Sequence, residues 1–225
     1  MILYNKSRLL WSSVLLLMGR AVFAQEIALD YFDSVSEHYK SILDYSADIV
    51  ITRGNTVQTA RLWYKQPNKL RLDFTSPRGM VMTVDGNSLQ VWVPANQVLF
   101  IQPLRRGSQA QLASISSSSG LALIKRDYTL SYNPGPELVN LEPGSEIKVV
   151  KLKAEWKTSA QGFRRLDLSI DSNKQIREVV GVTTTNEEII FSFSNLSVNR
   201  GIPDSKFQFD APPTGSIIEN FLFDP

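Results

Sequence analysis

The chain has 225 residues, enough for one substantial domain or two small ones, and 43% of them are hydrophobic. It contains no cysteine, which excludes disulfide bonds, cysteine-bound metal sites and a lipid anchor on an N-terminal cysteine. The formal net charge of +2 is too small to indicate a nucleic-acid partner.

Residues 1–24 are typical of a secretory signal peptide. Basic residues precede an apolar run from Leu9 to Met18, and Val22 and Ala24 supply the small residues of a signal-peptidase site. The run is too short to span a bilayer, so we expect cleavage after Ala24 rather than a retained anchor. The cleaved segment holds three of the 24 basic residues and none of the 22 acidic ones, so residues 25–225 would carry a net charge of −1 after export.

Apolar residues at intervals of three and four predict a helix from Glu26 to about Asp44. Its expected buried face consists of Ile27, Tyr31, Val35, Tyr39 and Ile42. The single histidine of the chain, His38, also lies on this helix, where a lone histidine is usually a surface or half-buried residue. We therefore expect the helix to pack against a sheet and to carry no chemistry.

Most of the following chain alternates apolar and polar residues with a period of two, which predicts β-strands. Turn residues such as Pro67-Asn68 and Asp85-Gly86-Asn87 separate the runs. The expected strands are Tyr45–Arg53, Val57–Lys65, Leu70–Thr75, Met80–Val84, Leu89–Val93, Val98–Gln102, Tyr128–Tyr132, Ile147–Trp156, Phe163–Ile170, Ile176–Thr184 and Glu188–Leu196. Nearby prolines favour an edge strand at Lys206–Asp210 and an irregular tail. About eleven strands after one helix predict a mainly β domain, residues 25–225, on a curved antiparallel sheet.

The connection from Arg105 to Lys125 is long, rich in serine and interrupted by glycine. Connections of this length in a compact domain are commonly lids or linkers, and this one can hold one or two short helices. Its expected lid residues are Leu112, Ile115, Leu121 and Leu123. Four cations flank the segment: Arg105, Arg106, Lys125 and Arg126. They are either solvated loop ends or a docking patch for an acidic partner or for lipid headgroups.

The sequence carries little of the chemistry that enzymes use. It has no nucleophile-elbow or phosphate-loop motif, and one histidine without any cysteine nearly excludes a zinc site. We therefore assign no catalytic residue, no metal site and no cofactor. A pair of carboxylates brought together by the fold, as in a glycosidase, stays open as an alternative.

Several short motifs occur in an order that is typical of one family. They are Leu62-Trp63-Tyr64-Lys65-Gln66-Pro67-Asn68, Ser76-Pro77, Val84-Asp85-Gly86, Ser205-Lys206-Phe207-Gln208-Phe209 and Pro212-Pro213-Thr214-Gly215. With a signal peptide and a helix before them, the chain resembles the LolA family of periplasmic lipoprotein carriers over most of its length. The resemblance implies an unclosed antiparallel β-barrel of about eleven strands, with helices as a lid over an apolar cavity for acyl chains.

The resemblance also implies that the protein is a monomer and that it has three kinds of partner. These are acylated lipoproteins or other lipids, an inner-membrane complex that releases them and an outer-membrane acceptor. Carriers of this family often have an arginine just before the Pro-Asn pair, where it hydrogen-bonds to the lid, but here that residue is Gln66. An amide can form such bonds without a charge, so control of the lid would differ.

Apolar residues of the expected strands are candidates for the lipid-binding cavity. They are Leu62, Tyr64, Leu70, Leu72, Phe74, Met80, Met82, Leu89, Val91, Val93, Phe191 and Phe193. Each is also consistent with an ordinary core, but a broad curved sheet with so little helix to cover it favours a hollow. Met80 and Met82 suit either state, because flexible thioethers repack around variable contents.

The leading interpretation is a periplasmic carrier that shields the acyl chains of lipoproteins, or another lipid, and delivers them towards the outer membrane. Two alternatives stay open: a lipid- or lipoprotein-binding sensor of the same fold, and a secreted hydrolase that uses two carboxylates. Bound lipid separates the first two functions from the third. Transfer of that lipid to an acceptor separates the carrier from the sensor.

Overall fold

A computed structural model describes residues 28–104, 117–158, 162–213 and 215–221. Its thirteen strands form one sheet in the order β13-β6-β5-β4-β3-β2-β1-β12-β11-β10-β9-β7, with β8 paired to β9. The strands are β1 (Asp44–Arg53), β2 (Thr56–Lys65), β3 (Lys69–Ser76), β4 (Val81–Val84), β5 (Ser88–Val93), β6 (Val98–Pro103), β7 (Tyr128–Tyr132), β8 (Val139–Asn140), β9 (Lys148–Trp156), β10 (Phe163–Asp171), β11 (Ile176–Thr183), β12 (Glu188–Val198) and β13 (Ser216–Glu219). The expected signal peptide lies outside the described residues.

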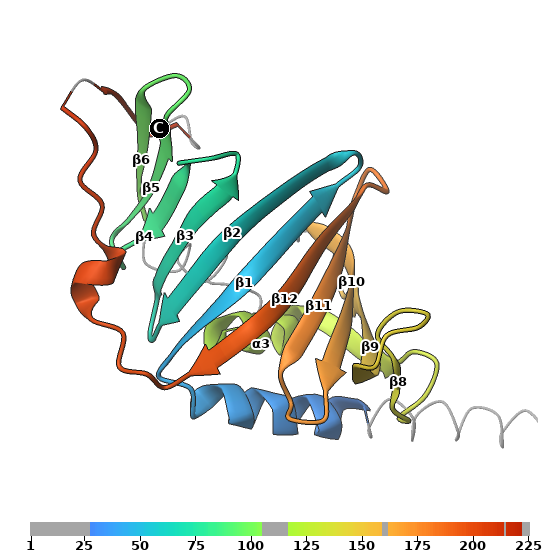
Figure 1. The fold of residues 1–225 in the computed structure, drawn as a ribbon. Helices are drawn as coiled ribbons and strands as arrows, with labels where there is room; N and C mark the ends of the chain where they lie inside the picture. Colours follow the sequence, from blue (N-terminus) through green and yellow to red (C-terminus); the bar gives the residue numbers. More distant parts are fainter. Residues whose placement is uncertain (1–27, 105–116, 159–161, 214, 222–225) are drawn as a thin grey trace, which may run out of the picture.

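The sheet bends strongly without closing on itself (Figure 1). Its neighbouring strands are antiparallel, apart from β13 and β6, which run parallel. The edge strands β7 and β13 stand at opposite ends of the strand order. The unclosed, mainly antiparallel β-barrel predicted from the sequence is therefore confirmed, with the very short β8 and the C-terminal β13 added to the predicted strands.

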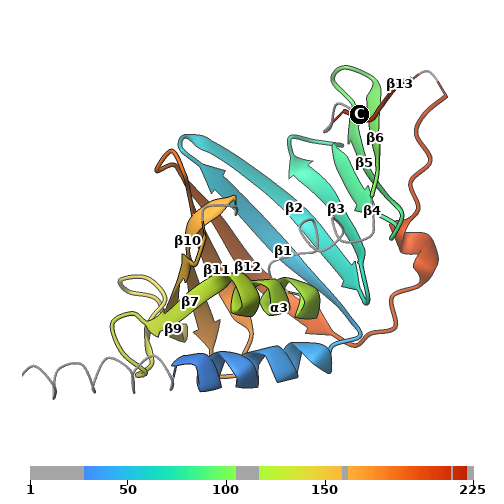
Figure 2. The same ribbon diagram turned by 180° about the vertical axis from the view of Figure 1, so that it is seen from behind.

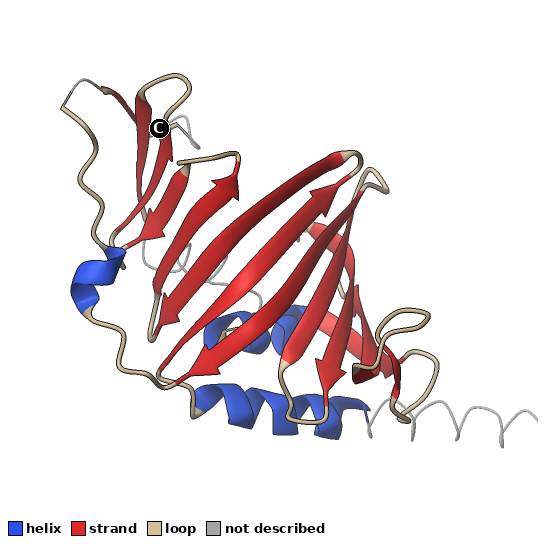
Figure 3. Ribbon diagram, viewed as in Figure 1, coloured by secondary structure: helices blue, strands red, loops and turns tan. Residues whose placement is uncertain are grey.

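Two helical segments lie on the inner face of the bent sheet, and Figures 1 to 3 show both near one end of the central strands: residues 28–40 (the N-terminal helix) and α3 (Ser118–Asp127). The N-terminal helix buries Ala28, Phe32, Val35 and Tyr39, which recur at the spacing of one helical face. The buried face therefore centres on Phe32, and Tyr31 lies at its half-buried border. The helix ends earlier than expected because Asp44 already begins β1.

The helix α3 has a defined start and end. The Ser117 side chain accepts a hydrogen bond from the Gly120 N–H at 3.1 Å, which caps the N-terminus. At the other end, Lys157 Nζ donates to the carbonyl oxygens of Lys125 at 3.3 Å and Arg126 at 3.0 Å. The helix thus forms at the end of the long connection for which the sequence predicts a lid.

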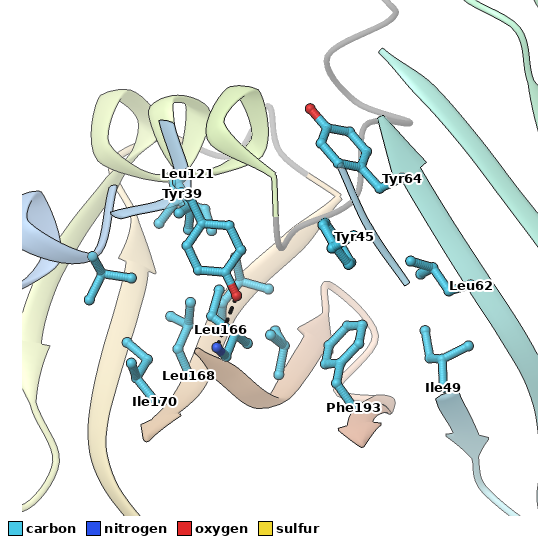
Figure 4. Close-up of a cluster of buried hydrophobic side chains, with 14 of the residues drawn as sticks. Tyr39, Tyr45, Ile49, Leu62, Tyr64, Leu121, Leu166, Leu168, Ile170 and Phe193 are labelled. Carbon is cyan, nitrogen blue, oxygen red and sulfur yellow. Dashed lines mark hydrogen bonds between the residues drawn. The ribbon is translucent and has the colours of Figure 1, made fainter. Parts of the chain in front are cut away.

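The main hydrophobic core lies between the inner face and the two helices, where Tyr39, Leu121 and Phe193 come together (Figure 4). The Tyr39 hydroxyl accepts a hydrogen bond from the Ile176 N–H of β11 at 3.0 Å. Burial raises the pKa of Tyr39, so the phenol stays neutral. This bond holds the N-terminal helix on the sheet, since a buried polar group left unpaired would cost about 1–3 kcal/mol.

After β12 the chain crosses the outer face of the sheet as a strap, residues 199–213, and joins the sheet edge as β13 (Figure 1). The edge strand predicted at Lys206–Asp210 is wrong. The segment instead contains a 3-10 turn, η1 (Asp204–Phe207), followed by non-strand residues.

Contacts to side chains explain why the strap does not become a strand. Arg71 Nη1 donates to the carbonyl oxygens of Lys206 at 3.1 Å and Gln208 at 2.9 Å. The Lys206 ammonium lies 3.5 Å from the centre of the Trp63 ring, and Phe207 is buried. An arginine side chain therefore takes the place that a neighbouring strand would have in a ladder.

Candidate functional site

The predicted cavity residues lie on the inner face of the sheet, in register across several strands. Pairing from β2 to β5 aligns one row: Leu62, Leu72, Met82 and Val91. A second row contains Tyr64, Leu70, Val84 and Leu89. Because side chains alternate across a strand, each row presents a continuous apolar strip to the inside of the bend.

These residues differ in how completely they are covered. Seven of the predicted set are buried: Leu62, Tyr64, Leu70, Leu72, Phe74, Leu89 and Phe193. Four more are half-buried and pack against the core: Met80, Met82, Val91 and Phe191. Val93 is half-buried but lies outside this core cluster. The apolar strip therefore continues from closed core into partly exposed surface.

Tyr64 connects β2 to the start of α3. The centroids of the Tyr64 and Tyr45 rings are 5.2 Å apart, and the Tyr64 hydroxyl donates to the Pro67 carbonyl oxygen at 3.2 Å. Burial raises the pKa of Tyr64, while hydrogen bonds with the side chains of Ser118 and Ser117 lower it in part. The contact between the sheet and the start of α3 is thus partly polar.

Gln66 joins β2 to the C-terminal end of the N-terminal helix. Its Nε2 donates to the carbonyl oxygens of Ile42 at 2.8 Å, Lys40 at 3.2 Å and Tyr39 at 3.5 Å. These are carbonyls at or just past the last turn, where the regular hydrogen bonds of the helix end. The residue at the family's arginine position therefore contacts the helix as a neutral amide.

Lys125 joins the two helices to each other. Its Nζ lies 2.6 Å from an Asp33 carboxylate oxygen, and both side chains stay partly exposed. An exposed pair of this kind contributes at most about 1 kcal/mol. The helices can therefore separate without a large electrostatic cost.

The predicted lid and docking residues are only partly within the described chain. Within α3, Leu121 is fully buried and Leu123 is half-buried. Arg126 is exposed and forms a two-point ion pair with the neighbouring Asp127. The remaining predicted residues lie outside the described residues: Arg105, Arg106, Leu112 and Ile115.

A pocket of about 630 Å³ opens on the inner face where β1, β2 and β12 end. We call it the rim pocket, and it is lined by Ile51, Arg53, Thr56, Gln58, Glu187, Ile189 and Phe191. Sequence reasoning identified Phe191 but missed the others. The alternation of Ile49, Ile51 and Arg53 along β1 was the available signal, because it places an arginine in line with core residues.

The part of the chain that the structure describes contains neither a group of metal ligands nor a membrane-spanning helix. No three or more histidine, aspartate or glutamate side chains are grouped to hold a metal ion. Neither described helix is long and apolar enough to cross a membrane.

Comparison with known proteins agrees with this architecture. A family model described as "Outer membrane lipoprotein carrier protein LolA" matches residues 51–210. The outer-membrane lipoprotein carrier protein of Chromohalobacter salexigens is 24% identical over 187 residues, which cover 80% of this chain and 82% of that protein. The protein of the same name from Coxiella burnetii is 23% identical over 181 residues, covering 80% and 78%.

Solved structures share the fold at low sequence identity. An uncharacterized conserved protein from Thermus thermophilus superposes with a TM-score of 0.55 and 13% identity, covering 85% of this chain and 98% of that one. MucB superposes with a TM-score of 0.51 and 17% identity, covering 83% and 64%. Since the family model spans more than half of the sequence, the chain belongs to the LolA family.

Proposed function

We propose that this protein is a periplasmic carrier that shields the acyl chains of lipoproteins, or of another lipid, and delivers them towards the outer membrane. The observation that carries the proposal is the apolar inner face, which continues past the two described helices. Met80, Met82 and Val91 keep part of their surface accessible there. Family membership favours binding over catalysis, so the two-carboxylate hydrolase becomes the weaker interpretation.

Energetics favour partial rather than complete burial of the cargo. A chain of about sixteen carbons would gain about 13 kcal/mol if every methylene left water. That gain alone corresponds to a Kd below about 1 nM, which would prevent release. We infer that acyl chains compete with the lid side chains Leu121 and Leu123 for the inner face, and that a partner shifts this balance.

The contacts of the helices suit such a lid. Gln66, Tyr64 and the Lys125–Asp33 pair hold the helices through a few polar contacts in addition to their buried faces. Each net contribution is about 1 kcal/mol, which a bound acyl chain can exceed. Gln66 is the proposed lid-contact residue, and its bonds lack the charge that an arginine would bring.

Partners are expected at the mouth of the site. An inner-membrane release complex would load the carrier and an outer-membrane acceptor would unload it. The exposed side chain of Arg126, with Lys125, Arg105 and Arg106, is the proposed docking patch for an acidic partner or lipid headgroups. Charge reversal of all four should slow transfer at low salt much more than at high salt.

The test of the function compares two substitutions in the mature chain. Met82→Glu places a charge on the half-buried inner face, and Val50→Glu places the same charge on the exposed outer side of β1. The parent protein and Val50→Glu should purify from cell envelopes with bound lipid or lipoprotein, detected by native mass spectrometry. Met82→Glu should lose it.

Transfer from the loaded protein to outer-membrane vesicles is the second measurement. Loaded protein that passes its cargo to the vesicles supports a carrier. Retention of lipid without any transfer would point to the sensor, and a parent protein that never binds lipid would overturn the proposal.

A further inference from the structure

We propose that the rim pocket is a separate amphiphile site, which takes one alkyl chain with a zwitterionic head and fills without movement of the helices. The inference deepens the proposed function and rests on it. It adds a second place on the inner face and names the class of molecule that this place accepts.

The floor of the pocket continues the core without being closed. Ile51 pairs with Phe191 across β1 and β12, and both are half-buried and pack against the core cluster. Ile49 and Phe193, one step further along the same face, are buried. Exposure therefore rises along one apolar strip toward the strand ends, and an alkyl chain laid on the strip would cover it.

The wall of the pocket is polar and has no net charge. Arg53 Nε and Nη2 donate to the two carboxylate oxygens of Glu187, each at 2.8 Å. Thr56 and Gln58 add an uncharged hydroxyl and amide. The Arg53 and Glu187 side chains are 62% and 38% exposed, so both charges remain available to a ligand.

This pair discriminates between headgroups. An anionic head would face Glu187 and a cationic head would face Arg53, so each meets one repulsion. A zwitterionic head can place its anion near Arg53 and its cation near Glu187. The pocket volume of about 630 Å³ is within the ordinary range for small-molecule sites.

The position of the pocket separates it from the lid. Figures 1 and 2 show both helices near one end of the central strands, and the β1–β2 and β11–β12 turns at the other. The lining residues come from these turns and the strand ends beside them. A ligand can therefore reach the rim pocket while the helices stay in contact with the sheet.

The first experiment measures binding to the mature chain by calorimetry and by NMR of ¹³C-methyl-labelled isoleucines. The probe is dodecylphosphocholine below its micelle concentration, with dodecyl sulfate and dodecyltrimethylammonium as charged probes with matched tails. Dodecylphosphocholine should bind most tightly and shift the Ile51 and Ile189 methyl signals. Equal binding of all three probes, or unshifted methyl signals, would overturn the proposal.

Two variants test the floor and the wall separately. Ile189→Asn should weaken dodecylphosphocholine binding about tenfold, because the floor loses apolar area. Arg53→Gln with Glu187→Gln removes both charges but keeps two polar side chains, and it should abolish the preference among the probes. Val57→Gln, at an exposed apolar residue of β2 outside the pocket lining, should leave binding unchanged.

A crosslink tests independence from the lid. The chain has no cysteine, so Asp33→Cys with Lys125→Cys can be joined selectively by a short bis-maleimide. Probe binding should change less than about twofold, while uptake of lipoprotein falls. Loss of probe binding on crosslinking would overturn the inference. If lipoprotein binds but the probe does not, this inference fails alone, whereas a chain that binds neither loses the proposed function as well.

Discussion

The two halves of the sheet differ in how their inner faces are filled. In the half from β9 to β11, Leu152, Leu168 and Val179 are 0% exposed beneath the helices. In the half from β2 to β5, Met82 and Val91 keep part of their surface accessible. A close-packed interior resists any added group, whereas a partly covered apolar face can accept one. The second half combines buried residues such as Leu62 and Leu72 with the partly accessible Met82 and Val91. We call the first half the frame and the second the adaptable surface.

The largest expected effect separates these halves directly. Leu168→Ala should lower the free energy of unfolding by about 2–5 kcal/mol, because it leaves a cavity in a closed core. Met82→Ala should cost less than half of that, since its side chain is half-buried. Urea unfolding measures both. Equal losses would mean that the two halves are packed alike.

Asp44, the first residue of β1, connects the sheet to the strap, and its loss should have the next largest effect. The buried carboxylate accepts hydrogen bonds from the backbone N–H groups of Arg200 at 2.8 Å, Gly201 at 3.0 Å and Ile202 at 3.2 Å. Asp44→Ala should destabilise the fold by about 1–3 kcal/mol, because three part-buried backbone N–H groups lose their acceptor. Hydrogen exchange should rise along the strap. Unchanged exchange at residues 200–202 would contradict this role.

Gln66 should affect the lid more than the frame. Gln66→Ala removes the donor to the Ile42, Lys40 and Tyr39 carbonyls and should cost about 1 kcal/mol. Hydrogen exchange near the end of the N-terminal helix should rise, and cargo release should accelerate. Gln66→Arg should restore the contact and make release salt-dependent. Identical release rates in all three proteins would show that Gln66 does not control cargo release.

The smallest expected effect is a loss of strap stability at low pH, through Asp204 on the outer face. Hydrogen bonds from Lys65 and Lys69 lower the pKa of Asp204 from 3.8 to about 2. Because the folded pKa is depressed, the contacts contribute at neutral pH and are lost as the pH falls from about 4 to about 2. The contribution is small, since the carboxylate is exposed and screened. Strap protection should fall over this range, and Asp204→Asn should reduce the fall.

Local patterns were sufficient for most elements and for placing the apolar strand residues on one face of the sheet. The period-two runs place Leu62, Leu72 and Met82 on one face whatever the neighbouring strand is. The local patterns failed at Lys206–Asp210. There Arg71 donates hydrogen bonds to the backbone of the segment, and Lys206 packs on the Trp63 ring on the outer face of the sheet. Alternation also could not show that one cross-strand partner of Ile51 is Phe191, about 140 positions away on β12.

The sequence by itself determined a strand-rich chain, one N-terminal helix, the family motifs and a set of inward-facing apolar residues, because these depend on spacing between near neighbours. The tertiary structure decided which of those residues are sealed and which stay accessible. Coverage depends on where two short helices come to lie on a sheet whose central pair, β1 and β12, joins residues far apart in the chain. The division into frame and adaptable surface, together with the rim pocket, follows from that placement.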